Sequence, residues 1–118
     1  MAVNVQTFVG KVVGNPSPKY FESGAVLAEF RIGVRRKYGH KDRGTMDWFQ
    51  VKLWGRVAET AVNYVKESHW VSIQGALEIE SWADKRTGLP RSKAVIVGET
   101  LDLIGEDPQG KGKQAQFE

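Results

Sequence analysis

The residues between Asp47 and Trp54 alternate between two kinds of chemistry. The apolar positions are Phe49, Val51 and Leu53, and the remaining positions hold Trp48, Gln50, Lys52 and Trp54. Successive side chains of a β-strand point to opposite faces, so this alternation predicts a strand with one face on a hydrophobic core. The other face carries two large rings, an amide and a cation, and any fold of this chain must accommodate it.

Two interpretations of that second face are open. Exposed rings interleaved with amides and cations form a surface on which nucleic-acid bases stack while positive charges meet phosphates. Alternatively, the rings cover a second core, because tryptophan is usually largely buried.

Length and composition limit what else the chain can be. With 118 residues it forms one domain, which buries about two-thirds of the surface of the unfolded chain. The absence of cysteine excludes disulfides and thiolate metal sites and suits a reducing compartment. There is no basic-then-apolar leader and no apolar run of about 20 residues, so we expect a cytoplasmic, nucleoid-associated protein without a membrane segment.

Positive charge is concentrated around the Trp48 strand. The whole chain has a formal net charge of +3, but eight cationic and only two anionic side chains lie between Arg31 and Arg56. A basic block beside an aromatic strand is the electrostatic pattern of a groove that follows a phosphate backbone. For the loop residues alone, a solvated charged loop is the alternative.

The rest of the chain predicts a small barrel. Period-two alternation indicates further strands over residues 26–34 and 70–82. Residues 3–13, rich in Val, Thr and Phe, and residues 92–103, near-continuously apolar at 94–97, are also expected to be strands. A turn is expected at 14–16, and Tyr20 and Phe21 are candidates for the start of the second strand. In the 70–82 strand, Val71, Ile73, Leu77 and Ile79 are expected to face the core, and Trp70 and Trp82 the polar side. Long basic loops are expected near 36–44 and 83–91.

Apolar residues recur at helical spacing between the third and fourth strands, at Val57, Ala58, Ala61, Val62 and Val65. We expect this short helix to plug one end of the barrel. The order is that of the OB-fold, an all-β, five-stranded barrel with a helix between strands 3 and 4, whose members bind oligonucleotides on one face. The domain is expected to span residues 1–104, and residues 105–118, which lack periodicity, to form a flexible tail.

Two rival functions remain open. A nuclease needs carboxylates that converge on a metal, but Asp42 and Asp47 are separated by loop residues, and His40 and His69 lack partners at ligand spacing. There is also no phosphate-loop or nucleophile motif, so we expect no enzyme, catalytic residue, metal or cofactor. The second rival is a protein-interaction barrel in which the outward tryptophans are subunit or partner contacts, with Phe49 and Trp70 as candidates for an oligomer interface.

The chain also resembles the bacterial single-stranded DNA-binding protein family over roughly residues 3–105. The matching segments are Val9-Gly10, Gly14 to Pro16, Tyr20, Gly24-Ala25-Val26, Asp47-Trp48-Phe49, Leu53 to Glu59, Tyr64-Val65-Lys66, Val71 to Gly75, Ser81-Trp82 and Leu101 to Gly105. The resemblance implies a homotetramer that wraps single-stranded DNA without sequence preference during replication, recombination and repair. It also implies that Trp48, Trp54 and Trp82 are base-stacking residues, with Tyr38 near a fourth.

The sequence departs from the family pattern in two places. Residues 35–44 differ in composition and spacing, and the tail lacks the acidic run closing in Pro-Phe that recruits other enzymes in the family. Recruitment through the tail is therefore not expected. The predicted single-stranded DNA interface consists of Trp48, Trp54, Trp82, Gln50, Lys52, Tyr38, Arg31, Arg35, Arg36, Lys37, Arg56, Lys85 and Arg86.

Overall fold

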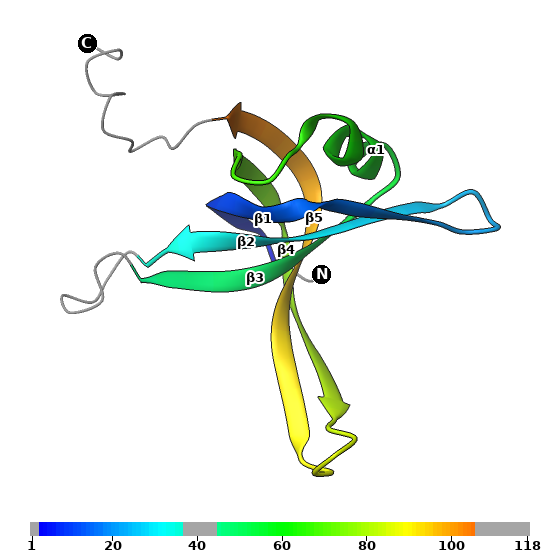
Figure 1. Cartoon of the computed structure of the whole chain (residues 1–118), viewed down its shortest axis with the longest axis vertical. Helices are drawn as coiled ribbons and strands as arrows, with labels where there is room; N and C mark the ends of the chain where they lie inside the picture. The colour runs from blue at the N-terminus through cyan, green and yellow to red at the C-terminus, as the bar shows by residue number, and fades with distance from the viewer. Residues whose placement is uncertain (1–2, 37–44, 106–118) are drawn as a thin grey trace.

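The computed structural model describes residues 3–36 and 45–105. They form five strands and one helix: β1 (Gln6–Tyr20), β2 (Val26–Arg35), β3 (Met46–Trp54), α1 (Gly55–Tyr64), β4 (Trp70–Ala83) and β5 (Pro90–Gly105). The strands close into a barrel in the order β1-β2-β3-β5-β4 (Figure 1). The predicted all-β fold, a five-stranded OB-type barrel with a helix between the third and fourth strands, is confirmed. The tail was predicted to span residues 105–118; Gly105 is the last residue of β5, and residues 106–118 lie outside the described residues.

The barrel closes through one short parallel contact. Residues Gln50–Leu53 of β3 pair with Val95–Gly98 of β5, whereas every other strand pair in the described barrel is antiparallel. Inward side chains such as Ile32, Val51 and Ile73 have no exposed surface. Because apolar burial is the main favourable contribution to folding, this interior fixes which face of each strand points outwards.

Helix α1 packs against β1, β2, β3 and β5. Its apolar stripe buries Ala58 and Ala61 completely within the same core cluster, so the stripe predicted from helical spacing packs on the barrel interior. Among the described residues, no helix has the length and apolar character needed to cross a membrane.

The predicted end of the first strand is wrong. Residues 14–16 were expected to form a turn, but β1 continues to Tyr20, and the pairing of β1 with β2 shifts between Val13 and Ser17. Gly14 has a φ of 75°, so these residues form a bulge inside the strand. Glycine and proline are favoured at bulges as well as at turns, so a bulge and a turn can have similar local sequences. Tyr20 consequently ends the first strand instead of starting the second.

Two orientations predicted for the fourth strand are also wrong. Trp70 was expected on the polar face but is only 6% exposed, because the pairing of β4 with β5 shifts between Trp70 and Val71 and both side chains become buried. Ile79 was expected in the core but is 64% exposed. It lies beyond Gly75, where the pairing of β4 with β1 ends, and it pairs with Ala94, just outside the contact of β5 with β3, so its inner face has no core to pack on. Figure 1 shows this β4–β5 hairpin extending beyond the rest of the barrel.

The backbones of β4 and β5 approach each other closely at Gly75. A Cβ atom at this position would overlap the backbone carbonyl oxygen of Val97. A second shift in the pairing of β4 with β5 lies between Gln74 and Gly75. The strands can therefore approach this closely only because residue 75 has no side chain.

We expect Gly75→Ala to lower the free energy of unfolding by about 1–3 kcal/mol, because the added methyl group must displace backbone atoms. Chemical denaturation followed by circular dichroism measures this change. The matched control is Gly33→Ala, whose added methyl group would meet the far ends of the Trp48 and Met46 side chains, at 2.7 and 2.9 Å, and those side chains can move. Equal stability of Gly75→Ala and wild type would contradict the close approach.

Candidate nucleic-acid interface

The outward face of β3 carries Trp48 and Trp54, as the alternation in the sequence predicts. Trp48 is 50% exposed and Trp54 is 47% exposed, while Val51 and Leu53 on the opposite face are completely buried. The rings therefore cover no second core within this chain. Trp48 and Trp54 are six residues apart on an extended strand, which separates them by about 20 Å.

Trp48 lies between a glycine and an arginine of β2. Its partner across the sheet is Gly33, and the missing Cβ atom leaves the space that the edge of the ring occupies. The guanidinium carbon of Arg31 lies 5.6 Å from the ring centroid, a cation–π distance. The ring is thus held across the sheet by neighbours that leave half of its surface open.

A hollow of about 370 Å³ opens beside this ring. Its lining comes from β2, β3 and β5 and consists of Arg31, Trp48, Phe49, Gln50, Lys93 and Ala94. The hollow therefore combines an aromatic wall with two cations and an amide, which suits a flat ring bearing a nearby negative charge.

The polar side chains between the rings form two hydrogen-bonded groups, which an ion pair between Lys93 and Glu80 connects. The amide of Gln50 donates to Glu29 at 2.8 Å and accepts from Lys93 at 2.6 Å, and Lys52 donates to Glu80 at 2.8 Å. The hydrogen bond from Lys52 lowers the pKa of the Glu80 carboxyl group, and the same bond raises the pKa of the Lys52 ammonium group. Both groups are accordingly charged at neutral pH.

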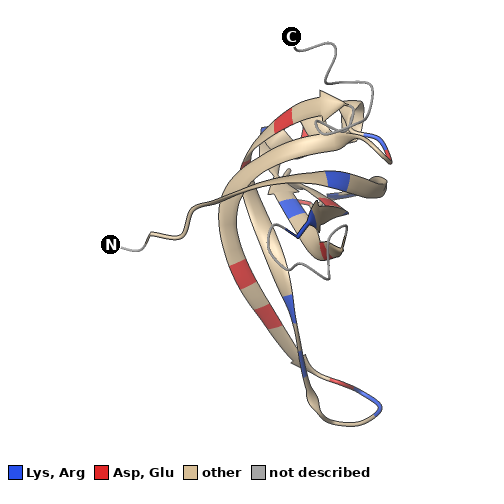
Figure 2. Cartoon of the chain, turned by 90° about the vertical axis from the view of Figure 1, so that its left-hand side faces the viewer, with Lys and Arg blue, Asp and Glu red and all other residues tan. Residues whose placement is uncertain are grey.

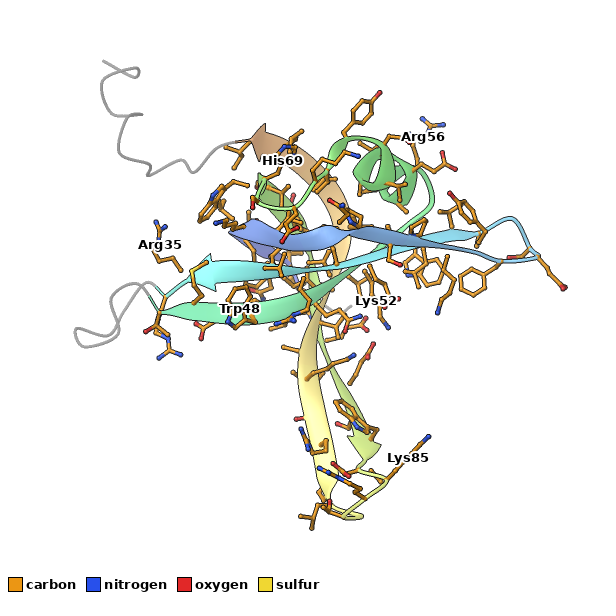
Figure 3. All side chains as sticks on the ribbon, viewed as in Figure 1. Arg35, Trp48, Lys52, Arg56, His69 and Lys85 are labelled. Carbon is orange, nitrogen blue, oxygen red and sulfur yellow. The ribbon has the colours of Figure 1, made fainter. Side chains whose placement is uncertain are left out.

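Trp82 reaches the same surface from β4. It is 46% exposed, and the ammonium group of Lys93 lies 5.7 Å from its ring centroid. Lys93 thus connects Trp82 with Gln50 on β3. We call this surface the aromatic face and define it as Arg31, Trp48, Gln50, Lys52, Trp82 and Lys93. Figure 3 shows Trp48 and Lys52 along one side of β3.

Trp54 lies at the other end of β3, beside the β1–β2 hairpin. Its ring stacks on Phe21, with 5.8 Å between ring centroids and 29° between the planes. Sequence reasoning missed both Phe21 and Lys93. Phe21 had one local signal, an aromatic residue just before a turn, but only the pairing of Leu27 with Trp54 brings the two rings together.

Four of the predicted basic residues lie elsewhere. Arg35 stands over the buried Trp70, with 5.4 Å from its guanidinium carbon to the ring centroid. Arg56 is on α1, and Lys85 and Arg86 lie at the tip of the β4–β5 hairpin; Figure 3 labels Arg56 and Lys85 at opposite extremes of the molecule. Arg35 and Arg56 thus lie on Trp70 and on the helix, whereas Lys85 and Arg86 follow Trp82 of the aromatic face by three and four residues along the chain.

Arg36 forms an ion pair with Asp47 at the start of β3, at 2.7 Å. The hydrogen bond from Arg36 lowers the pKa of the Asp47 carboxyl group. This carboxylate is therefore engaged with a cation of the same chain. The two remaining predicted residues, Lys37 and Tyr38, lie outside the described residues.

Histidine has a structural role in the described residues. His69 accepts a hydrogen bond at Nδ1 from the backbone N–H of Lys66, at 3.2 Å, in the connection between α1 and β4. No group of three or more histidine or acidic side chains within residues 3–36 and 45–105 is arranged to hold a metal ion.

The five-stranded barrel, its helix between β3 and β4 and its half-exposed tryptophans beside cations define an OB-type domain, and comparison with known proteins identifies the family. Residues 3–104 match the model of the Single-strand binding protein family. The chain belongs to this family.

Similar proteins extend over almost the whole chain. It is 45% identical over 105 residues to Single-stranded DNA-binding protein 1 of Synechocystis sp., which covers 89% of this chain and 86% of that protein. It is 37% identical over 117 residues to Single-stranded DNA-binding protein 1 of Nostoc sp., covering 99% and 96% of the two chains.

A solved structure has the same fold. The small single-stranded DNA-binding protein from Streptomyces coelicolor superimposes with a TM-score of 0.75 over 93% of this chain and all of that chain. At 21% sequence identity this similarity supports the barrel fold and not the individual contacts.

Proposed function

We propose that the protein binds single-stranded DNA without sequence preference and so protects and organises it during replication, recombination and repair. The observation that carries the proposal is the pairing of half-exposed tryptophans with cations on one face of the barrel. Membership of the Single-strand binding protein family supports the same function, as do the names of the relatives from Synechocystis and Nostoc.

The chemistry of the aromatic face favours unpaired bases. Every base has a π-face, so stacking on Trp48 or Trp82 does not depend on sequence. Lys93 and Arg31 sit against these same rings, so their positive charges lie close to where the phosphates of a strand with stacked bases would run. A duplex keeps its bases stacked on one another and cannot use the rings in this way. The protein acts in this proposal as a binding protein and not as an enzyme.

Replacement of a ring should weaken binding measurably. We expect Trp48→Ala, Trp54→Ala and Trp82→Ala each to weaken binding of oligo-dT by about 1–3 kcal/mol, the usual contribution of one stacking residue. Fluorescence anisotropy with a labelled oligonucleotide measures the affinity, and circular dichroism checks the fold. The control is Tyr64→Ala, which removes a 64% exposed ring from α1. Three folded tryptophan variants that bound like wild type would refute the stacking assignment.

Salt should weaken binding because bound phosphates release counterions. We expect log K to fall with log salt by roughly 0.7 for each phosphate contact, and Lys93→Gln to reduce the slope by about one such contact. Lys66→Gln, at an exposed position after α1, is the matched control with the same change of charge. We also expect a duplex of equal length to bind far more weakly, and equal affinity for both would argue against a site for unpaired bases.

We infer a homotetramer from the family resemblance. The two residues first considered as subunit contacts support it less than expected, because Trp70 is buried within the chain and Phe49 packs on Phe8, with 5.1 Å between ring centroids. Exposed valines of the N-terminal segment, Val5, Val9 and Val13, offer other apolar surface for association.

Sedimentation equilibrium at micromolar concentration should give a mass near four times the 13.2 kDa of one chain. A mass of one chain at that concentration would contradict the tetramer. It would leave the stacking prediction unaffected, because the aromatic face is complete within one barrel.

A further inference from the structure

The carboxylate of Glu80 forms ion pairs with both lysines of the aromatic face. Glu80 Oε2 accepts a hydrogen bond from Lys52 Nζ at 2.8 Å, and Glu80 Oε1 lies 3.9 Å from Lys93 Nζ. Glu80 and Lys93 are direct partners in the pairing of β4 with β5, and Lys52 reaches them from β3. The lysines between Trp48 and Trp82 therefore have an acidic partner from the chain itself.

This arrangement extends along the hairpin. Figure 2 shows acidic residues on one strand of the β4–β5 hairpin and basic residues on the other. Glu78 and Glu80 belong to β4, and Arg91 and Lys93 belong to β5. The lysines that would meet the phosphates of a DNA strand bound across Trp82 and Trp48 are thus already in contact with the Glu80 carboxylate.

The ion pairs are exposed enough to exchange partners. The side chains of Lys52, Glu80 and Lys93 keep 25%, 36% and 42% of their surface accessible. Ion pairs at such exposure are weak, because water and salt screen them. A phosphate oxygen can accept the same charge-assisted hydrogen bonds from lysine that the carboxylate accepts. A phosphate can thus take the place of Glu80.

We propose that Glu80 is an internal competitor of the DNA backbone. Its carboxylate holds Lys52 and Lys93 in the free protein and gives them up to phosphates when a single strand lies across Trp48 and Trp82. This inference rests on the proposed function of the aromatic face. It makes Glu80 a residue that limits affinity, and the limit is strongest at low salt, where the ion pairs of Glu80 with the two lysines are least screened.

The test is Glu80→Gln, which keeps the shape of the side chain and an oxygen that can accept from Lys52. At about 50 mM salt we expect this variant to bind oligo-dT roughly two- to fivefold more tightly than wild type, the range that a partly exposed charge pair supports. The gain should shrink at about 300 mM salt. Glu59→Gln on α1 removes the same charge from an exposed position away from this face and should give no gain.

Two further measurements distinguish competition for the lysines from a change of structure. A thymidine oligomer with an uncharged methylphosphonate backbone should bind wild type and Glu80→Gln equally. In a background of Lys52→Gln and Lys93→Gln, Glu80→Gln should give no gain, because there is no lysine to release. Thermal unfolding checks the fold, and Glu80→Ala, which also removes the carboxylate, should reproduce the gain.

Equal affinity of wild type and Glu80→Gln for oligo-dT at low salt would overturn the inference while leaving the proposed function intact. A gain that persisted with the uncharged oligomer, or without the two lysines, would overturn it as well. A wild-type protein that bound no oligo-dT would instead overturn the proposed function, and this inference with it.

Discussion

The parallel contact between β3 and β5 is the constraint on which the aromatic face depends. It joins only Gln50–Leu53 to Val95–Gly98, yet it is the step that closes the sheet. Because β5 also pairs with β4 along its length, closure brings Glu80 next to Lys52 of β3 and connects Trp82 to Gln50 of β3 through Lys93. Without this contact Lys93 could not reach Gln50, and the face would consist of one strand with two separated rings.

The electrostatics of this face are close to balanced in the free protein. Arg31, Lys52 and Lys93 provide three cations, and Glu29 and Glu80 provide two carboxylates that hydrogen bond with neighbours on the same surface. Such pairs contribute little to stability, because they remain partly exposed to water. Their main effect is to fix the positions of long side chains between the rings. They also lower the positive potential of this face below what the basic sequence between Arg31 and Arg56 suggested.

Local patterns in the sequence predicted the parts of the structure that local geometry decides. The alternation from Asp47 to Trp54 was enough to orient Trp48 and Trp54 outwards, and helical spacing was enough for Ala58 and Ala61. Trp70 and Ile79 were misplaced because a shift in strand pairing and the reach of a hairpin depend on partner strands. Phe21 and Lys93 were missed for the same reason, since each acquires its role from a residue far away in the sequence. Arg35 and Arg56 were included in the predicted interface because of their charge, and charge alone does not indicate which way a side chain points.

The topology of the barrel also has a consequence for how the chain folds. Gln6 pairs with Gly75 and Gln50 pairs with Val95, so the contacts that close the sheet join residues that are distant in sequence. Barrels dominated by such pairings fold on the order of milliseconds to seconds. The reason is that the entropy cost of closing long loops must be met before the distant strands form their favourable contacts. During synthesis the hairpin of β1 and β2 and the strand β3 emerge first, with their inner faces uncovered until β5 is complete. The nascent protein therefore exposes apolar surface that can aggregate until the last third of the chain has been synthesised.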